Sequence, residues 1–363
     1  MRFMLYVLLL LIPVVSAGTD NDSIQGVSLN ISAFNPSRGE QVKLSYTLSR
    51  PETVTIRIYD PDGGLVRTLL DQVAQAVGKQ EIGWDGLDDE KQRVPDEAYT
   101  FTIETASGAV HDPTTSSGGT VGDITDARFD EGGTVTYKLP AAARVMIRLG
   151  LHNGPMLKTL VDWKPRVAGE ITEYWDGYDA DKLIKVRDRK DFSALITYVA
   201  LPELTVISYG NDKEIYRDYK LGRGKDRPRK PERPSRSEPT GQLQPAQLAP
   251  PAWFISPRVS ILFPNNPEAD NRNIPTVQDA IDVRIDVAPT DREQLLNDQF
   301  EVILFVNNVF FAEAERGYLP LNWHWELQQL PPGEHLLTVN VSSFKGQVGV
   351  ASRKIRIVRP EVR

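Results

Sequence analysis

Hydrophobic and polar positions alternate along the first third of the chain, which is the pattern of half-buried strands. In residues 42–48 an apolar side chain stands at every second position, with lysine, serine and threonine between them. Residues 54–59 repeat the alternation, and an Asp-Pro-Asp-Gly-Gly turn at 60–64 follows. Short alternating runs divided by turns are typical of an antiparallel β-sandwich. The predicted strands cover residues 42–48, 54–59, 65–70, 78–84 and 99–105.

The whole pattern returns 91 residues later. Trp84-Asp85-Gly86 recurs as Trp175-Asp176-Gly177, and matching residues on both sides keep the same offset without a gap. Such a register indicates an internal duplication. Because tryptophan is a large apolar anchor and Asp-Gly favours a turn, both copies of the motif are predicted to be structural. The second copy has predicted strands at 134–139, 145–151, 156–161, 170–175 and 192–199, after a Ser-, Thr- and Gly-rich linker at 106–122.

A third set of β-rich runs lies between residues 256 and 358. Asn307-Asn308 separates two of them and is a good two-residue hairpin turn, since asparagine tolerates positive φ. The seven predicted strands are 258–263, 281–287, 301–306, 309–312, 323–327, 335–341 and 348–358. The sequence therefore predicts an all-β protein in which three immunoglobulin-like β-sandwich domains are joined by linkers.

The segment between the second and third sets has two parts. Residues 205–209 and 214–219 flank a Gly-Asn-Asp turn and predict an added hairpin. Beyond them, residues 220–240 hold eight Lys or Arg against three Asp or Glu, and seven prolines lie between Pro228 and Pro251. Such a composition cannot build a core, so residues 220–255 are predicted to be a disordered linker. Its positive charges are either a solvated spacer or contacts to an anionic surface. The candidate contacts are Arg223, Lys225, Arg227, Arg229, Lys230 and Arg233.

The chain begins with the pattern of a signal peptide. Arg2 precedes an apolar run from Phe3 to Val15, which ends in the small-residue sequence Val15-Ser16-Ala17. The run is shorter than the roughly 20 residues that cross a bilayer, so we expect cleavage of residues 1–17 and export to the periplasm, the cell surface or the extracellular space. The sequence has no cysteine, which excludes disulfides, thiolate catalysis, zinc-cysteine sites and acylated-cysteine anchors.

Several motifs of the first set resemble the FlgD-type immunoglobulin-like domain. They are Phe34-Asn35-Pro36, Leu44-Ser45-Tyr46-Thr47-Leu48, Val54 to Tyr59, Gly64 to Leu69, Gly78, Trp84-Asp85-Gly86, Val94-Pro95 and Tyr99. That family includes a module of flagellar hook-capping proteins and similar modules of bacterial secreted and surface proteins. The resemblance implies domains at 27–107 and, as a degenerate copy, 123–219. A looser resemblance to bacterial Ig or fibronectin-type modules covers 256–358. The leader and the second copy make a hook-capping role unexpected.

Catalysis needs converging side chains, and the sequence offers no such group. The four histidines, His111, His152, His324 and His335, are scattered without a pair at ligand spacing. Ser342 and Lys345 match a fragment of a β-lactamase motif without its partner motifs. Gly222 to Lys225 lacks the spacing of a phosphate loop. No catalytic residue and no cofactor are therefore predicted.

One acidic loop is a candidate calcium site, because calcium is bound by several oxygen ligands from a flexible loop. Asp85, Asp88 and Asp89 are followed by Glu90, and the second copy has Asp176, Asp179 and Asp181. The spacing fits no EF-hand. The favoured interpretation is that these carboxylates satisfy the backbone of a turn.

Two functions remain open. The chain is either a non-catalytic structural or assembly protein of the bacterial envelope, or a glycan- or substrate-binding accessory subunit of a secreted enzyme system. The first would bind envelope or extracellular protein partners, for instance by strand addition to a sheet edge, and no nucleic acid is expected. The second would present planar aromatic residues, for which Trp323 and Trp325 are the candidate pair, although at that position a core role is favoured.

Overall fold

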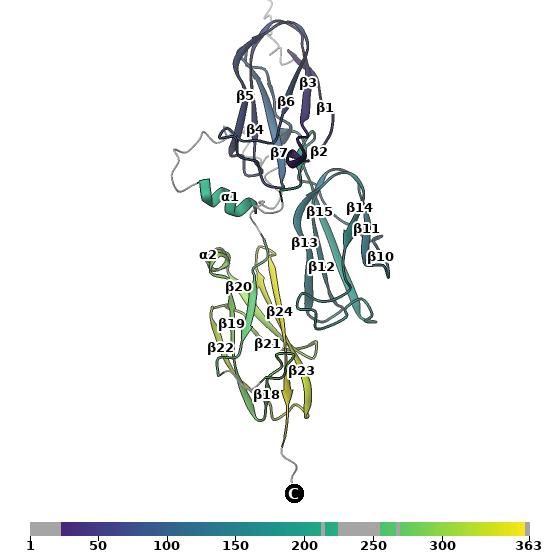
Figure 1. Ribbon diagram of the computed structural model, residues 1–363, viewed down its shortest axis with the longest axis vertical. Helices are drawn as coiled ribbons and strands as arrows, with labels where there is room; N and C mark the ends of the chain where they lie inside the picture. The colour runs from purple at the N-terminus through teal and green to yellow at the C-terminus, as the bar shows by residue number, and fades with distance from the viewer. Residues whose placement is uncertain (1–22, 212–214, 224–254, 266–268, 360–363) are drawn as a thin grey trace, which may run out of the picture.

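The computed structural model describes residues 23–211, 215–223, 255–265 and 269–359. Figure 1 shows three β-sandwiches, with the first and third toward opposite ends of the long axis and the second beside them. The all-β prediction of three immunoglobulin-like sandwiches is confirmed. The predicted signal peptide lies outside the described residues. Within the described part of the chain no helix is long and apolar enough to cross a membrane.

The first sandwich packs a three-stranded sheet against a larger one. The small sheet has the order β1 (Ile24–Leu29), β3 (Val42–Leu48) and β6 (Gly78–Trp84). The larger sheet has the order β2 (Ala33–Phe34), β16 (Val206–Ser208), β7 (Ala98–Thr105), β4 (Glu52–Tyr59) and β5 (Leu65–Gln75), and β8 (Val110–His111) also pairs with β7. The alternating side chains of β3 point into the core between the sheets, as the sequence pattern predicts.

β16 reaches this sheet from beyond the second sandwich. Ile207 lies opposite Ala33 of β2 in a parallel pair and opposite Ala98 of β7 in an antiparallel pair. The first sandwich therefore contains residues far outside 27–107. Residues 206–208 were expected in the second domain, but their partners lie in the first.

The second sandwich repeats the arrangement with fewer strands. One sheet has the order β10 (Arg128–Phe129), β11 (Thr134–Leu139) and β14 (Gly169–Tyr174). The other has the order β13 (Met156–Arg166), β12 (Ala143–Leu151), β15 (Phe192–Ala200) and β9 (Val121–Asp123). β8 and the start of β9 lie in the stretch 106–122 that was expected to be a linker, and the short 3-10 helix η2 (Pro113–Thr115) lies between them. That stretch is thus shared between the two sandwiches.

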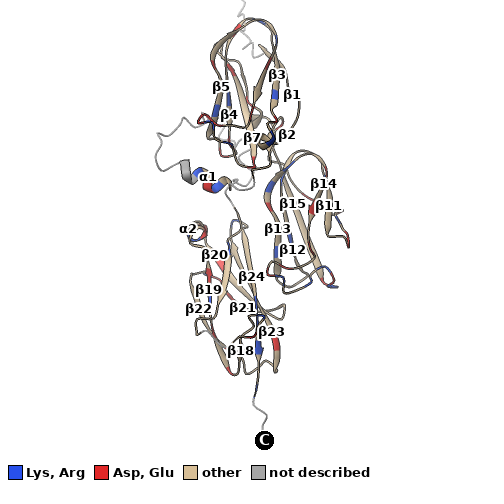
Figure 2. Ribbon diagram, viewed as in Figure 1, with Lys and Arg blue, Asp and Glu red and all other residues tan. Residues whose placement is uncertain are grey.

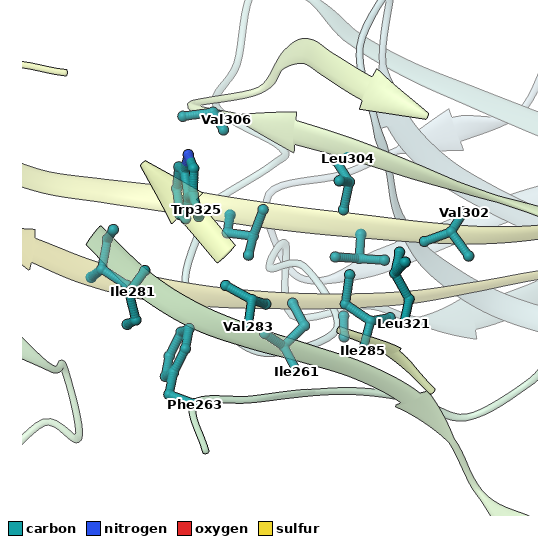
Figure 3. Packing of buried hydrophobic residues seen from close by; sticks show 14 of the residues in the cluster. Ile261, Phe263, Ile281, Val283, Ile285, Val302, Leu304, Val306, Leu321 and Trp325 are labelled. Atoms are coloured by element: carbon teal, nitrogen blue, oxygen red, sulfur yellow. The ribbon is translucent and has the colours of Figure 1, made fainter. Parts of the chain in front are cut away.

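The third sandwich has a three-stranded and a five-stranded sheet. The first has the order β17 (Val259–Leu262), β19 (Ala280–Val287) and β22 (Leu321–Glu326); the second has the order β18 (Thr276–Val277), β24 (Val348–Ile357), β23 (Gly333–Ser343), β20 (Phe300–Val306) and β21 (Val309–Ala314). Figure 3 shows Ile261, Val283 and Trp325 of the three-stranded sheet together with Val302, Leu304 and Val306 of β20 in the core cluster. Asn307 and Asn308 form the predicted hairpin turn, with φ of 53° and 68°.

Two α-helices in the described residues were not predicted. Helix α1 (Tyr216–Arg223) replaces the second arm of the hairpin expected at 214–219 and includes the start of the expected linker. Tyr216 and Tyr219 are both buried, and a spacing of three residues places side chains on one face of a helix rather than of a strand. Helix α2 (Pro289–Asp298) begins with proline at its first turn, followed by Asp291, which are both favourable at a helix N-terminus.

Candidate interaction surfaces

The Trp84-Asp85-Gly86 motif holds the first sandwich together. Trp84 is 1% exposed and its ring lies 5.4 Å from that of Phe34, centroid to centroid. Its indole Nε1 donates a hydrogen bond to the carbonyl of Leu87 (3.0 Å), so the buried polar atom is paired. Gly86 has φ of 72°, and a Cβ there would stand 2.3 Å from Cγ of Pro36. The turn therefore requires glycine for two reasons, its backbone conformation and its close approach.

The second copy reproduces this geometry. Trp175 is 1% exposed, and its Nε1 donates to the carbonyl of Tyr178 (2.8 Å). Asp176 accepts from the amide of Tyr178 as Asp85 accepts from that of Leu87, both at 3.1 Å. The guanidinium carbon of Arg187 lies 5.1 Å from the centroid of the Trp175 ring. Both motifs are thus placed as turn and core, and neither tryptophan is available to a ligand.

The acidic loop of the first sandwich uses its carboxylates for hydrogen bonds within the protein. Asp85 accepts from Arg67 Nη1 (2.9 Å), and Asp89 accepts from the Thr68 amide (3.0 Å). Asp88 Oδ1 accepts from the amides of Glu90 and Gln92, and its Oδ2 accepts from the Tyr219 hydroxyl (3.1 Å). Across the described residues, no group of three or more His, Asp or Glu side chains is placed to hold a metal ion.

In the second copy, Asp179 takes the place of Asp88. Its Oδ1 accepts from the amides of Leu183 and Ile184 (2.6 and 2.8 Å). Its Oδ2 is buried and has no hydrogen-bond partner among the described residues, and this burial raises the pKa of Asp179. The first sandwich fills the same position with Tyr219, so the two copies differ in what covers their acidic loop.

The other residues singled out from the sequence are distributed over the first and third sandwiches. His111 stacks on Phe101 in the first sandwich, whereas His324 pairs with Asp282 in the third. Lys345 makes an ion pair with Asp298. Trp323 and Trp325 stack with centroids 5.1 Å apart, but Trp325 is 1% exposed and belongs to the core. The pair therefore does not present two aromatic faces to a glycan.

Helix α1 lies on the first sandwich and contacts its acidic side chains. Tyr216 donates to Asp62 Oδ2 (2.8 Å), and Lys220 Nζ lies 2.8 Å from Asp60 Oδ2. Burial raises the pKa of the Tyr216 hydroxyl, and the neighbouring Asp60 and Asp62 raise it further. The hydroxyl therefore stays protonated and acts as a donor. Figure 2 shows the charged residues of α1 between the first and third sandwiches.

The joint between the first two sandwiches contains a buried ion pair. Arg144 of β12 and Glu97, which precedes β7, lie 2.7 Å apart, and their side chains are 3% and 5% exposed. Glu97 Oε1 also accepts from the Ala98 amide (2.7 Å), and Arg144 Nη1 donates to the Trp163 carbonyl (3.0 Å). Such a pair needs these additional hydrogen bonds to offset the cost of removing two charges from water.

The second and third sandwiches contact each other through hydrogen bonds between side chains and backbone groups. The side-chain amide of Asn340 accepts from the Met156 amide (2.9 Å) and donates to the Met156 carbonyl (2.8 Å). Asp181 accepts from the Ser352 amide of β24 (2.6 Å), and Arg148 donates to the Gly346 carbonyl. The Asn340 side chain thus pairs with both backbone groups of Met156 in β13, as the backbone of a neighbouring strand would.

A shared carboxylate links α1 to the third sandwich. Asp291 at the start of α2 accepts from Arg217 Nη1 (2.8 Å) and from Arg258 Nε (through Oδ2, 3.0 Å). Burial alone would raise the pKa of Asp291, but the hydrogen bonds from Arg258 and Arg217 outweigh it and lower the pKa to about 2. All three sandwiches are therefore connected by contacts of the described residues.

The candidate anionic contacts cannot be placed in the same way. Arg223 is the last residue of α1. Lys225, Arg227, Arg229, Lys230 and Arg233 lie outside the described residues.

In the comparison with known proteins, one family model matches the first sandwich. The family model described as the FlgD Ig-like domain matches residues 31–109. Among solved structures, FlgD from P. aeruginosa is 23% identical and aligns over 24% of this chain and 67% of its own, with a TM-score of 0.20. The fibronectin(III)-like modules of Clostridium thermocellum CbhA are 9% identical over 93% and 97%, with a TM-score of 0.22. No curated protein matches the chain.

Residues 31–109 therefore have the sequence of a FlgD Ig-like domain, as the motifs around Trp84 indicate. The match ends before β9 begins the second sandwich.

Proposed function

We propose that the protein is a non-catalytic, exported structural or scaffolding protein of the bacterial cell envelope or surface, which binds protein partners through its sandwich modules. The match to the FlgD Ig-like domain and the all-β fold support a structural role. The leader sequence supports export, and the four histidines are distributed over all three sandwiches.

The observation that carries the proposal is how the first sandwich holds a distant part of the chain. β16 adds a strand beside β7. Two tyrosines and a lysine of α1 contact acidic side chains of the same sandwich. Strand addition and helix docking are two general modes of peptide recognition. The module thus recognises protein segments within its own chain, and the proposed function extends this recognition to partners.

The basic segment is proposed as an additional contact to an anionic surface. Its positive charges contrast with a chain whose formal net charge is −7, and a cluster of like charge attracts oppositely charged partners. A contact of this kind weakens as salt is raised, because exposed charges are screened.

Crosslinking of the tagged full-length chain in its native envelope, followed by mass spectrometry, tests the proposal. We expect the same envelope or surface proteins to be recovered repeatedly, with crosslinks that map to the sandwiches. Recovery of no protein, together with retention on polysaccharide columns, would instead support the accessory-subunit function.

A matched pair of variants tests whether the basic segment is a contact to an anionic surface or only a spacer. One variant has glutamine at its six candidate positions, and the control has glutamine at six exposed basic positions elsewhere. Loss of partners in the first variant alone would establish an anionic contact, whereas equal recovery in both would make the segment a spacer. The control positions are Lys43, Lys79, Arg128, Lys138, Lys164 and Lys190.

A further inference from the structure

Helix α1 covers one end of the first sandwich with a single face. Tyr216, Tyr219 and Lys220 lie on that face, because residues three and four positions apart are neighbours on a helix. Lys220 Nζ lies 2.8 Å from Asp60 Oδ2 and 3.9 Å from Asp62 Oδ2. An isolated helix as short as the eight residues of α1 is marginal in water. The contacts with the sandwich therefore hold α1 in place, rather than its own stability.

Asp60 and Asp62 belong to the turn between β4 and β5, but the same turn forms without carboxylates. The second copy has Leu151 and Asn153 at these positions, 91 residues later. In both turns the first residue donates to the carbonyl of the fifth and accepts from the amide of the fourth. In the first copy Asp60 Oδ1 accepts from two amides of the turn, whereas its Oδ2 faces Lys220. The charges at this turn therefore serve the contact with α1.

The same end of the second sandwich also holds a segment from elsewhere in the chain. There the third sandwich takes the place of α1, and Asn340 pairs with both backbone groups of Met156. Met156 follows its turn as Leu65 does, 91 positions earlier. In the adjoining loop, Asp181 accepts from the Ser352 amide. Both copies of the fold thus use one end to bind another segment.

Helix α1 neutralises the acidic end of the first sandwich only in part. Among the described residues, the ion pairs of Asp60 and Asp62 are both with Lys220, so one ammonium faces two carboxylates. The two carboxylate side chains are 2% and 19% exposed. Burial raises the pKa of Asp62, and the hydrogen bond from Tyr216 and the charge of Lys220 offset this rise only in part. A helix with one more positive charge on this face therefore fits the site better than α1 does.

We propose that the acidic end of the first sandwich is a docking site for a basic helix of a partner protein, which displaces α1. The partner helix carries cations at the positions of Tyr216 and Lys220, one turn apart, so that each faces one carboxylate. This inference rests on the proposed function and identifies the site and the chemistry of one partner. Without the partner, α1 covers the two carboxylates.

Synthetic peptides test the site on the full-length mature protein. They comprise residues 215–223 and are covalently stapled into a helix through positions 218 and 222. One peptide carries Tyr216→Arg, one is unchanged and one carries Tyr216→Glu. The protein carries Tyr216→Phe with Lys220→Met, which weakens the docking of its own α1. We expect the Tyr216→Arg peptide to bind about tenfold more tightly than the unchanged peptide, as one added charge-assisted hydrogen bond allows, and the Tyr216→Glu peptide not to bind.

A matched pair of variants places the peptide on the protein. Asp60→Asn with Asp62→Asn keeps the acceptors of the turn and should abolish binding of the Tyr216→Arg peptide. Glu131→Gln with Glu315→Gln, at exposed positions of the other two sandwiches, should leave binding unchanged. An unaltered melting temperature of the first variant shows that its sandwich is still folded.

Displacement is measured in a protein whose α1 keeps its contacts with the sandwich. Because the sequence has no cysteine, a spin label at Asp218→Cys reports on α1 alone, and the side chain of Asp218 is 60% exposed. We expect the Tyr216→Arg peptide to increase the mobility of the label, and the Tyr216→Glu peptide to leave it unchanged. Binding of the Tyr216→Arg peptide without a change in mobility would overturn the displacement of α1.

The remaining outcomes separate this inference from the proposed function. If no peptide binds, or if all three bind equally, the docking site is refuted even where envelope proteins crosslink to the sandwiches. If the Tyr216→Arg peptide binds as expected but no envelope protein crosslinks, the proposed function is refuted and the docking site stands. Self-association of the chain that the unchanged peptide abolishes would make a second copy the occupant and overturn the partner proposed.

Discussion

Replacing Arg144 by methionine removes one half of the buried ion pair that joins the first two sandwiches. The Glu97 carboxylate is 5% exposed and would lose its charged partner while keeping the hydrogen bond from the Ala98 amide. Breaking a buried pair by removing one partner typically costs about 3 to 5 kcal/mol, because the remaining charge is buried and uncompensated. We expect a loss of this size in the free energy of unfolding.

The double variant Arg144→Met with Glu97→Gln separates this penalty from the loss of packing. Glutamine keeps the size of Glu97 and an acceptor for the Ala98 amide but carries no charge. The double variant should therefore recover most of the stability that Arg144→Met loses, to within about 1 to 2 kcal/mol of the wild type. Both variants lose the hydrogen bond from Arg144 to the Trp163 carbonyl, which costs about 1 kcal/mol of stability in each. This loss therefore does not change the difference in stability between the two variants.

Urea unfolding, followed by circular dichroism and by hydrogen exchange of the two sandwiches, measures these changes. Hydrogen exchange is needed because a protein of several domains need not unfold in one step. If Arg144→Met changes the free energy by less than about 1 kcal/mol, or if the double variant is less stable than Arg144→Met alone, the pair is not the buried, paired contact on which the expected magnitude rests.

Three further predictions concern individual sites. Trp84→Ala should lower the stability of the first sandwich by about 3 to 5 kcal/mol, as is usual for emptying a core aromatic site; an unchanged unfolding midpoint would contradict its buried position. Millimolar calcium should leave the melting temperature unchanged; a rise of several degrees that is lost in Asp85→Ala or Asp88→Ala would identify a calcium site. The pKa of Asp291 is lowered to about 2, so its contribution to stability should be complete above about pH 4 and lost as the pH falls through 2. An Asp291→Asn variant that shows the same loss of stability over that range would assign the loss to other groups.

The strands could be predicted because a half-buried strand leaves a period of two in the sequence. In β3 the positions from Val42 to Leu48 alternate between buried and less buried, in the order the pattern predicts. The Trp84 and Trp175 turns were also predictable, since each indole donates its hydrogen bond to a carbonyl only three positions further along the chain. The FlgD-type motifs identified the first sandwich because they recur in order along one continuous stretch of the sequence, from Phe34 to Tyr99.

Other features could not be predicted because their causes lie far apart in the sequence. Nothing within residues 206–208 indicates that they pair with Ala33 and Ala98. Helix α1 did leave a signal, since Tyr216, Tyr219 and Lys220 have the spacing of one helical face. The β-rich composition beside a turn outweighed that signal and favoured a hairpin. The acidic residues that α1 contacts on the first sandwich lie far away in the sequence, so these contacts could not be predicted.

The return of β16 to the first sandwich makes the second sandwich an insertion within the first. During synthesis, the large sheet of the first sandwich lacks the strand between β2 and β7 until residues 206–208 have been made. The second sandwich, whose strands all lie between Val121 and Ala200, is complete before that. The inserted module can therefore fold first and bring together the two parts of its host. A chain that stops after Ala200 would leave Ala98 and Tyr99 of β7 without the strand that pairs with them, and an unpaired strand edge can pair with another chain.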